Sequence, residues 1–265
     1  MFEYSFMQNA LIAGLIISIL CPAVGAFLVL KRYSMMGDTL SHASFAGVAI
    51  GLVFGYNPII TAFIFTSLCA LLIEFLRDYF KKYAELILVI IMTLSIGIAI
   101  TLISSGKTNA NINSFLFGSI LTVTKNDLVT VLVLGVISLI VLALLYNKLI
   151  YVTFDEDGAK VSGIKIKLIN YIFALLVGTT VSVSIRIMGI LVVSSMIAMP
   201  VAAALQLHKG FNVTFISSIV FGFIAIMTGL FSSYYINSAP GGTIALASVA
   251  VLLVVILIKK IGKAY

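Results

Sequence analysis

The sequence predicts an all-α membrane protein: a polytopic transmembrane helical bundle of about nine spans, forming one transmembrane domain over residues 1–265. Hydrophobic residues make up 62% of the chain and charged residues only 9%. The apolar residues fall into runs of about 20, the length of helix that crosses the hydrocarbon core of a bilayer. The 16 basic and 9 acidic side chains are too few to cover so much apolar surface in a soluble domain. No loop is long enough to bury a second core.

Nine spans are expected, within a range of about eight to ten. The first apolar segment stays as a spanning helix, because it is too long for a signal peptide and has no basic leader or small-residue cleavage site. Later spans are separated by turn signals at Asn57-Pro58, at Arg186 and at residues 239–242. The expected spans are roughly 6–30, 39–56, 58–76, 85–104, 127–148, 168–185, 187–207, 212–235 and 243–258.

The basic residues indicate an orientation for these spans. When the connecting segments are assigned alternately to the two sides of the membrane, 13 of the 16 basic residues fall on one side and 3 on the other. The minority are Lys107, Lys125 and Arg186. Basic residues collect in cytoplasmic loops, so we expect the N-terminus outside the cell and the C-terminus in the cytoplasm.

Asp38 and His42, a carboxylate and an imidazole, stand four positions apart at the beginning of the second apolar segment. Residues at this spacing share one face of a helix. Ionisable groups inside membrane segments mark ion or proton routes by default. Carboxylate and imidazole are ligands for divalent metals such as Zn²⁺, and two ligands suit a transit site that must release its ion. Two plainer interpretations stay open: Asp38 as a helix N-cap and His42 as an ordinary core histidine.

A second informative feature is the loop at about 151–167, which the topology places in the cytoplasm. It carries three consecutive acidic residues, Asp155, Glu156 and Asp157, on the basic side of the membrane. Asp155 is suited to cap a short helix that Gly163 would close. Such a helix along the membrane face would be a docking element for a partner, and a solvated loop is the alternative. The polar loop at 105–126 on the other side is open to two interpretations, a re-entrant segment or an ordinary loop.

Enzyme motifs are absent from the sequence. No G-x-x-x-x-G-K-[ST] phosphate-binding loop occurs, because Ile164 follows Gly163 where that motif requires lysine. No H-E-x-x-H occurs either, and His42 and His208 are the only histidines, which excludes a multi-histidine centre. We therefore expect a transport subunit and not an enzyme.

The assembled motifs resemble the integral-membrane permeases of ABC-type zinc, manganese and iron importers. The likeness runs over essentially the whole chain, with the segments in the family's order and spacing. The carrying segments are YSMMGDTLSHASFAGVAIG (33–51), FDEDGAKVSGI (154–164), RIMGILVVSSMIAMPVAAALQLHKGF (186–211) and GLFSSYYINSAPGGTIAL (229–246). The stretches SMMGDTLSH and SAPGG look closer to zinc-type members, although Asn237 stands where such sequences often carry aspartate.

The resemblance implies a multi-pass protein of the bacterial plasma membrane that imports a divalent transition metal, with Zn²⁺ favoured over Mn²⁺ or Fe²⁺. It implies a homodimer, a cytoplasmic ABC ATPase that binds the ATP, and an extracytoplasmic metal-binding protein. This chain itself would hold no cofactor. Asp38 and His42 match the family's metal-path positions. The positions that match its ATPase-coupling helix are Asp155, Glu156, Asp157, Gly158, Ala159, Val161 and Gly163. An ion-coupled secondary transporter without an ATPase is the alternative.

Overall fold

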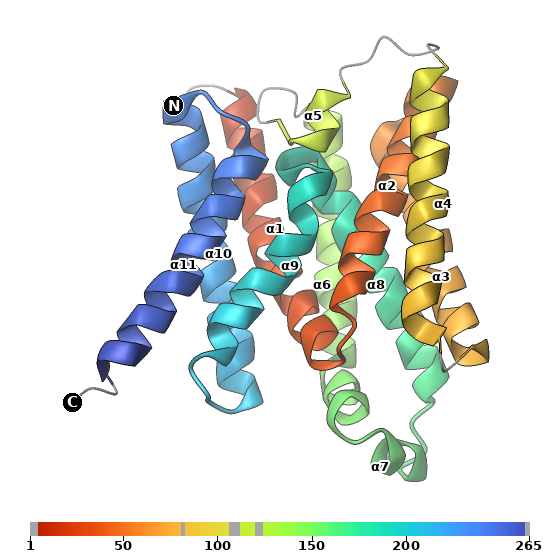
Figure 1. Ribbon diagram of the computed structural model, residues 1–265, viewed down its shortest axis with the longest axis vertical. Coiled ribbons are helices and arrows are strands. Elements are labelled where there is room, and N and C mark those ends of the chain that lie inside the picture. The colour runs from red at the N-terminus through yellow and green to blue at the C-terminus, as the bar shows by residue number, and fades with distance from the viewer. Residues whose placement is uncertain (1–4, 81–82, 106–111, 120–123, 263–265) are drawn as a thin grey trace.

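The computed structural model describes residues 5–80, 83–105, 112–119 and 124–262, and the secondary structure of these residues is entirely helical. Figure 1 shows a bundle of long helices with two short helices at opposite ends of it. The helices are α1 (Ser5–Leu30), α2 (Ser34–Phe54), α3 (Pro58–Tyr79), α4 (Ala84–Ser104), α5 (Asn113–Leu116), α6 (Lys125–Phe154), α7 (Glu156–Val161), α8 (Ile166–Met188), α9 (Ile190–Leu205), α10 (Phe211–Ile236) and α11 (Pro240–Gly262).

The long helices coincide with the nine predicted spans. Seven are long and apolar enough to cross a membrane by length and composition. The other two are α9, a shorter apolar helix of 16 residues, and α2. Although 21 residues long, α2 is less apolar because it contains Asp38, His42 and several serine and glycine residues.

Of the turns expected at Asn57-Pro58 and at Arg186, the first is confirmed and the second is wrong. Asn57 is the N-cap of α3, as its Asn-Pro signal predicts, and its Oδ1 accepts a hydrogen bond from the Ile59 amide at 2.9 Å. The expected turn at Arg186 is wrong, because Arg186 lies in the last turn of α8. The chain breaks instead at Gly189, whose φ of 76° is the left-handed conformation that glycine adopts without a steric penalty.

The helices form two groups joined by a buried centre. On one side α2 packs with α3 and α4, and on the other α10 packs with α11, α9 and α1. The most buried spans are α1 and α8, whereas most of α4, α6 and α11 is exposed and available to lipid. We call the two ends of the bundle the α7 end and the α5 end, after the short helix at each (Figure 1).

Small residues allow the helix backbones to approach closely. A Cβ added at Gly47 would lie 2.5 Å from Ala62 Cα, so α2 and α3 touch backbone to backbone there. Similarly, a Cβ at Gly25 would lie 2.0 Å from the Ile197 carbonyl oxygen, where α1 crosses α9. Small residues at such crossings are the usual packing device of membrane helices.

An aromatic cluster centred on Phe27 holds four helices together toward the α7 end. Phe27 is fully buried, and its ring meets Tyr146 of α6, Phe173 of α8, and Phe211 and Phe215 of α10 at centroid distances of 5.4–6.2 Å. Aromatic pairs at these distances are favourable beyond the area they bury.

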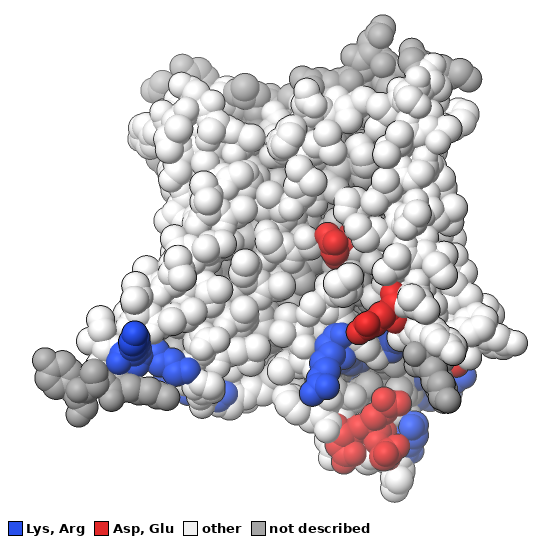
Figure 2. Space-filling model, viewed as in Figure 1, with Lys and Arg blue, Asp and Glu red and all other residues white. Residues whose placement is uncertain are grey.

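Charged residues gather at the α7 end, which Figure 2 shows as blue and red atoms at the bottom of the view. Contacts that join the helix ends there include the ion pair of Asp78 with Lys167 and the ring contact of Phe154 with Phe211. The described basic residues at this end are Lys31, Arg32, Arg77, Lys148, Lys160, Lys165, Lys167, Lys209, Lys259 and Lys260. At the α5 end the described basic residues are Lys125 and Arg186; Lys81, Lys82, Lys107 and Lys263 lie outside the described residues.

Candidate functional site

Asp38 and His42 lie on the one uncovered strip of the first half of α2. From Met36 to Ser44 every residue is buried except these two, which are half-buried. The pattern follows from their spacing of four, which returns to the same face of a helix. The opposite faces of this segment pack against α3, α4, α8 and α9. The predicted sharing of a face is therefore confirmed, and both side chains point away from the core of the chain.

Neither side chain is engaged by the rest of the described chain. The hydroxyls beside them have partners: Ser41 Oγ donates to the Gly37 carbonyl of the same helix at 2.8 Å, and Thr39 Oγ1 donates to the Leu88 carbonyl of α4 at 3.4 Å. Within the described residues, by contrast, the side chains of Asp38 and His42 take part in no hydrogen bond or ion pair. The N-cap interpretation of Asp38 is wrong: α2 begins at Ser34, and Tyr33 is its N-cap residue.

The pair lies in the half of α2 that begins at the α7 end. At 1.5 Å per residue, Asp38 lies about 6 Å and His42 about 12 Å along α2 from Ser34. The ribbon of α2 starts above the lower ends of α1 and α8 in Figure 1, so α2 begins inward from the end of the bundle.

The neighbouring helix α9 also keeps small and polar side chains partly uncovered. It packs against α2 beside the pair, where a Cβ on Gly37 would lie 3.5 Å from Ile197 Cδ1. Ser194, Ser195 and Ala198 of α9 are half-buried. Ser194 and Ser195 are therefore only partly covered within one chain.

One chain supplies only part of a metal site. Carboxylate and imidazole both bind divalent transition metals, but a Zn²⁺ site normally has four ligands. No cluster of three or more His, Cys, Asp or Glu residues suited to a metal ion occurs among the residues described. A cation bound by Asp38 and His42 would therefore need further ligands from water or from another molecule.

The predicted short helix after Asp155 is present as α7. Asp155 is its N-cap, and its Oδ1 accepts a hydrogen bond from the Gly158 amide at 2.8 Å. Gly163, with a φ of 76°, follows the helix and turns the chain back toward α8. Asp/Glu residues in the first turn, here Glu156 and Asp157, are favourable to the helix dipole.

The two faces of α7 differ in burial. Ala159 is fully buried and belongs to the main hydrophobic core, which attaches the helix to the bundle. Val161 is 91% exposed, although it is apolar. Lys160 forms exposed ion pairs with Glu156 at 3.5 Å and Asp157 at 3.2 Å, and the bond from Asp157 raises the pKa of Lys160. α7 therefore presents charged residues and one apolar side chain at the surface.

Between α7 and the start of α2 lies a polar cavity of about 430 Å³ that sequence reasoning missed. Its wall includes Glu156 of α7, Tyr33 before α2 and Arg77 of α3. The Arg77 guanidinium bonds the Tyr33 hydroxyl and lies 3.7 Å from the centre of its ring. Arg77 also pairs with the buried Glu74 at 3.1 Å. Tyr33 is distant in sequence from Glu74 and Arg77, and the three residues belong to no motif, so only the fold brings Tyr33 to the ion pair.

The α1–α2 turn is held on its other side by Lys31. Its ammonium donates to Asn170 Oδ1 of α8 at 2.8 Å and lies 5.1 Å from the centre of the Phe173 ring. Burial lowers the pKa of Lys31 to about 8, and the charge of Glu74 partly opposes this effect.

The α5 end is closed by glycine contacts and one buried ion pair. A Cβ at Gly241 would lie 2.2 Å from the Met188 carbonyl oxygen, and the Gly241 amide donates to the Phe117 carbonyl at 3.1 Å. Arg186 pairs with Asp127 at 3.2 Å and lies 4.7 Å from the Phe115 ring centre. The described part of the predicted 105–126 loop is thus anchored to α8 and α11.

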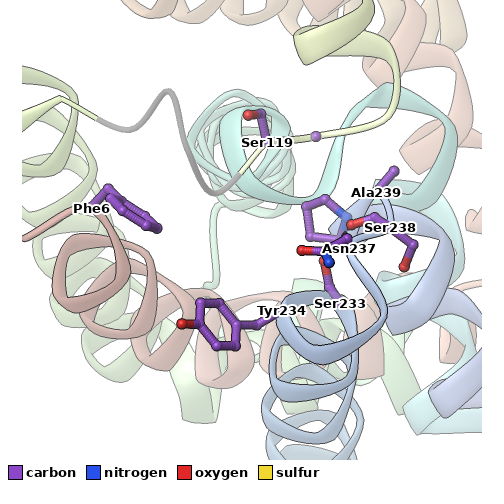
Figure 3. A pocket seen from close by; sticks show the side chains of 9 residues that line it. Phe6, Ser119, Ser233, Tyr234, Asn237, Ser238 and Ala239 are labelled. Carbon is purple, nitrogen blue, oxygen red and sulfur yellow. Dashed lines mark hydrogen bonds between the residues drawn. The ribbon is translucent and has the colours of Figure 1, made fainter. Parts of the chain in front are cut away.

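A cavity of about 340 Å³ lies beside this closure (Figure 3). Ser233, Tyr234 and Asn237 of the α10 end face it together with Phe6 and Ser119, so its lining is uncharged and combines polar with apolar groups. Asn237 is the C-cap of α10 with a φ of 53°, a conformation that asparagine tolerates better than most residues. The backbone conformation at position 237 therefore accounts for the asparagine without any role in metal binding.

Comparison with known proteins places these features in one family. Residues 3–259 match the ABC 3 transport family. The chain is 48% identical over 264 residues to a "Probable metal transport system membrane protein" of Treponema pallidum (strain Nichols), with 100% of this chain and 99% of that protein covered. It is 30% identical over 256 residues to the "Manganese transport system membrane protein MntC" of Listeria monocytogenes, with 96% and 91% covered.

Two solved structures share the fold. "PsaBC from Streptococcus pneumoniae in complex with Fab" superposes with a TM-score of 0.84 at 28% identity, covering 96% of this chain and 91% of that one. "An inward-facing conformation of a putative metal-chelate type ABC transporter" gives a TM-score of 0.71 at 17% identity, covering 94% and 85%, and bears on the fold alone.

Proposed function

Because the chain belongs to the ABC 3 transport family and is a non-catalytic permease subunit, we propose that it imports a divalent transition metal through a path lined by Asp38 and His42. The observation that carries the proposal is the burial pattern of α2. A carboxylate and an imidazole are the only uncovered residues between Met36 and Ser44, and no described residue of this chain pairs with either. Unpaired ionisable groups at membrane depth are costly, which favours a functional role.

A second copy of the chain would complete the site. A two-fold axis alongside α2 would bring a second Asp38 and His42 to face the first pair, giving up to four protein ligands. Four ligands of these types suit a divalent metal, and each chain alone offers two. The partly uncovered serines of α9 would then be covered by the partner.

The ATP that drives transport would be bound by a separate ATPase at the α7 end. Val161 and the charged residues of α7 offer a docking element there. In this arrangement Asp155, Glu156, Asp157, Gly158, Ala159, Val161 and Gly163 form the coupling helix and its turns. The excess of basic residues makes the α7 end cytoplasmic, with the N-terminus outside and the C-terminus inside. An extracytoplasmic metal-binding protein would deliver the ion to the α5 end.

Manganese is the first metal to test. The sequence features favour zinc, whereas relatives with a metal in their names, at 29–30% identity, are called manganese permeases. Carboxylate and imidazole accept both ions, so the two donor types do not separate them. We place manganese first because whole-chain similarity outweighs two short motifs, and zinc is the alternative.

Uptake of radioactive manganese and zinc by cells that express the permease with its ATPase and metal-binding protein tests the proposal. We expect Asp38→Asn and His42→Gln to lower uptake of the transported metal at least about tenfold, since even the outer-shell partners of metal ligands contribute ~10–100-fold. The matched control is Ser44→Ala. It changes a residue of the same helix whose buried Oγ has no hydrogen-bond partner, and it should leave uptake near the wild-type level.

Normal uptake by both Asp38→Asn and His42→Gln at wild-type membrane levels would refute the metal path. The secondary-transporter alternative is separated by the energy source. Transport in vesicles that persists without ATP and without an ATPase, but collapses with the proton gradient, would favour that alternative.

A further inference from the structure

The polar cavity beneath α2 suggests how motion of α7 reaches the metal path. We propose that Tyr33, Arg77 and Glu74, here called the Tyr33 cluster, are positioning residues that transmit displacement of α7 to α2 and so to Asp38 and His42. The inference rests on the proposed transport function. It adds residues that touch neither the metal nor the ATPase but determine how much metal moves for each ATP hydrolysed.

The Tyr33 cluster fixes the beginning of α2 to the end of α3. The guanidinium of Arg77 is bonded to the Tyr33 hydroxyl and lies 3.7 Å from the centre of its ring. On its other side it pairs with the Glu74 carboxylate at 3.1 Å. Tyr33 directly precedes the first residue of α2, and its carbonyl accepts the Met36 amide at 2.9 Å. A shift of the Tyr33 ring is therefore passed to the first turn of the helix.

The α1–α2 turn is stiff enough to carry such a shift. Arg32 adopts a φ of 59°, and the Tyr33 amide donates to the Leu28 carbonyl at 2.8 Å. Lys31 ties the same turn to α8 through Asn170. Asp38 lies only five residues after Tyr33 within a continuous helix, so rotation or translation of the turn moves Asp38 as part of one rigid element.

The ion pair of the cluster is not explained by stability alone. Glu74 is 4% exposed, and a buried ion pair must overcome the desolvation of both charges. Apolar residues of similar size stabilise such positions as well or better. An ion pair instead offers a bond that a third charge can compete for, which suits an element that changes state.

The third charge is the Glu156 carboxylate of α7, which lies across the cavity. Glu156 and Lys160 of α7 line the cavity of about 430 Å³ together with Tyr33 and Arg77. α7 itself packs on α6 and α8, which leaves open space between it and the Tyr33 cluster. Movement of α7 into this space brings the Glu156 carboxylate toward Arg77, where it competes with Glu74. Arg77 then shifts on the Tyr33 ring and the start of α2 moves with it.

The test uses the full transporter, with ATPase and metal-binding protein, in proteoliposomes that contain ATP. Three quantities are measured: metal transported, ATP hydrolysed, and equilibrium binding of manganese to the complex. For Arg77→Gln and Tyr33→Ala we expect ATP hydrolysis and manganese binding near wild type. Metal moved per ATP should fall about tenfold, within the ~5–150-fold range typical of coupling between two sites. Tyr33→Phe, which keeps the ring under Arg77 and loses the hydroxyl, should give a smaller fall.

Lys167→Gln is the matched control. It removes a 3.0 Å ion pair with Asp78 at the rim of the same cavity, but it does not touch the start of α2, and it should leave metal per ATP unchanged. A wild-type ratio in Arg77→Gln, or a parallel loss of hydrolysis and transport that leaves the ratio unchanged, would overturn the inference. If Arg77→Gln does not assemble, Tyr33→Phe decides by the same ratio.

Different results would refute the proposed function and the role of the Tyr33 cluster. Absence of ATP-dependent metal transport by the wild-type complex would refute the proposed function. Coupled transport by the wild type that Tyr33 and Arg77 variants leave unaltered would refute only the role of the Tyr33 cluster.

Discussion

At the scale of single residues, Lys31 links the packing of the α1–α2 turn to pH. Burial lowers its pKa from 10.5 to about 8 in the folded protein. Folding therefore disfavours its protonation; the resulting destabilisation is complete below about pH 8 and is relieved as the pH rises toward 10.5. Tyr33 stays neutral through the lower part of this window, because burial raises the pKa of its phenol.

We predict that the thermal unfolding midpoint of the purified wild type rises between about pH 7.5 and 9.5 relative to that of Lys31→Gln. The amide of glutamine can still donate to Asn170 but does not titrate. Differential scanning fluorimetry in detergent at a series of pH values measures the difference. Parallel pH profiles for the two proteins would show that the buried ammonium does not contribute in this way.

Gly241 and Gly242 are adjacent but have different surroundings. Comparing an alanine substitution at each position therefore distinguishes the effect of close packing from the effect of losing glycine's backbone freedom. A Cβ at Gly241 would lie 2.2 Å from the Met188 carbonyl oxygen, whereas a Cβ at Gly242 would meet nothing within 4 Å. We predict that Gly241→Ala lowers the unfolding free energy by ~1–3 kcal/mol, the usual cost of overpacking. Gly242→Ala should be close to neutral. Thermal unfolding of both variants decides, and equal effects would contradict the packing argument.

At the scale of elements, α7 depends on one side chain for its first turn. Its six residues are too few for a stable isolated helix, and the Asp155 cap and the burial of Ala159 hold it. We predict that Asp155→Ala removes about 1 kcal/mol of local helix stability and weakens binding of the ATPase to the detergent-solubilised permease. Asp155→Asn, which also caps well, should retain most of the binding.

Asp157→Ala is the control for charge in this experiment. It removes an acidic residue of α7 whose exposed pairing with Lys160 contributes little. ATPase binding measured by biolayer interferometry should follow the order wild type, Asp157→Ala, Asp155→Ala. Equal binding by Asp155→Ala and Asp157→Ala would show that the Asp155 cap is not needed to hold α7 in the conformation that binds the ATPase.

Elements with a strong local signal were predictable from sequence. Hydropathy locates the long helices to within a few residues, Asn57 marks the start of α3, and Asp155 marks the start of α7. The face shared by Asp38 and His42 followed from their spacing alone. The turn predicted at Arg186 was wrong. A basic residue near the end of an apolar run is typical of an interfacial turn, whereas here Arg186 is paired with Asp127 inside the bundle.

The Tyr33 cluster could not be predicted, because Tyr33 lies 41 positions from Glu74 and 44 from Arg77, and each residue has an ordinary local explanation. Tyr33 resembles an interfacial aromatic residue, and Arg77 and Glu74 resemble an exposed pair at a helix end. Only the packing of α2 on α3 places the guanidinium on the Tyr33 ring. Tertiary contacts of this kind leave no periodicity in the sequence.

At the scale of the whole molecule, the partly uncovered strip of α2 is where the proposed second chain would make contact. Met35, Asp38 and His42 follow one another at helical spacings of three and four, so they share a face. Met35 is 53% exposed although it is apolar. The homodimer that the proposed function requires would bring the two copies of this strip together near the two-fold axis, whereas exposed residues of α4 would face lipid.

We predict that Met35→Cys forms a cross-linked dimer in native membranes when treated with a short bifunctional maleimide. The parent chain for this experiment has Cys21 and Cys69 replaced by alanine, since both are free and buried thiols. The matched control is Ile90→Cys on α4, which is 62% exposed and should stay monomeric under the same conditions. Gel mobility of the membrane fraction measures the outcome. Cross-linking at Ile90 but not at Met35 would place the contact between copies on another face and leave Asp38 and His42 without the second pair of ligands.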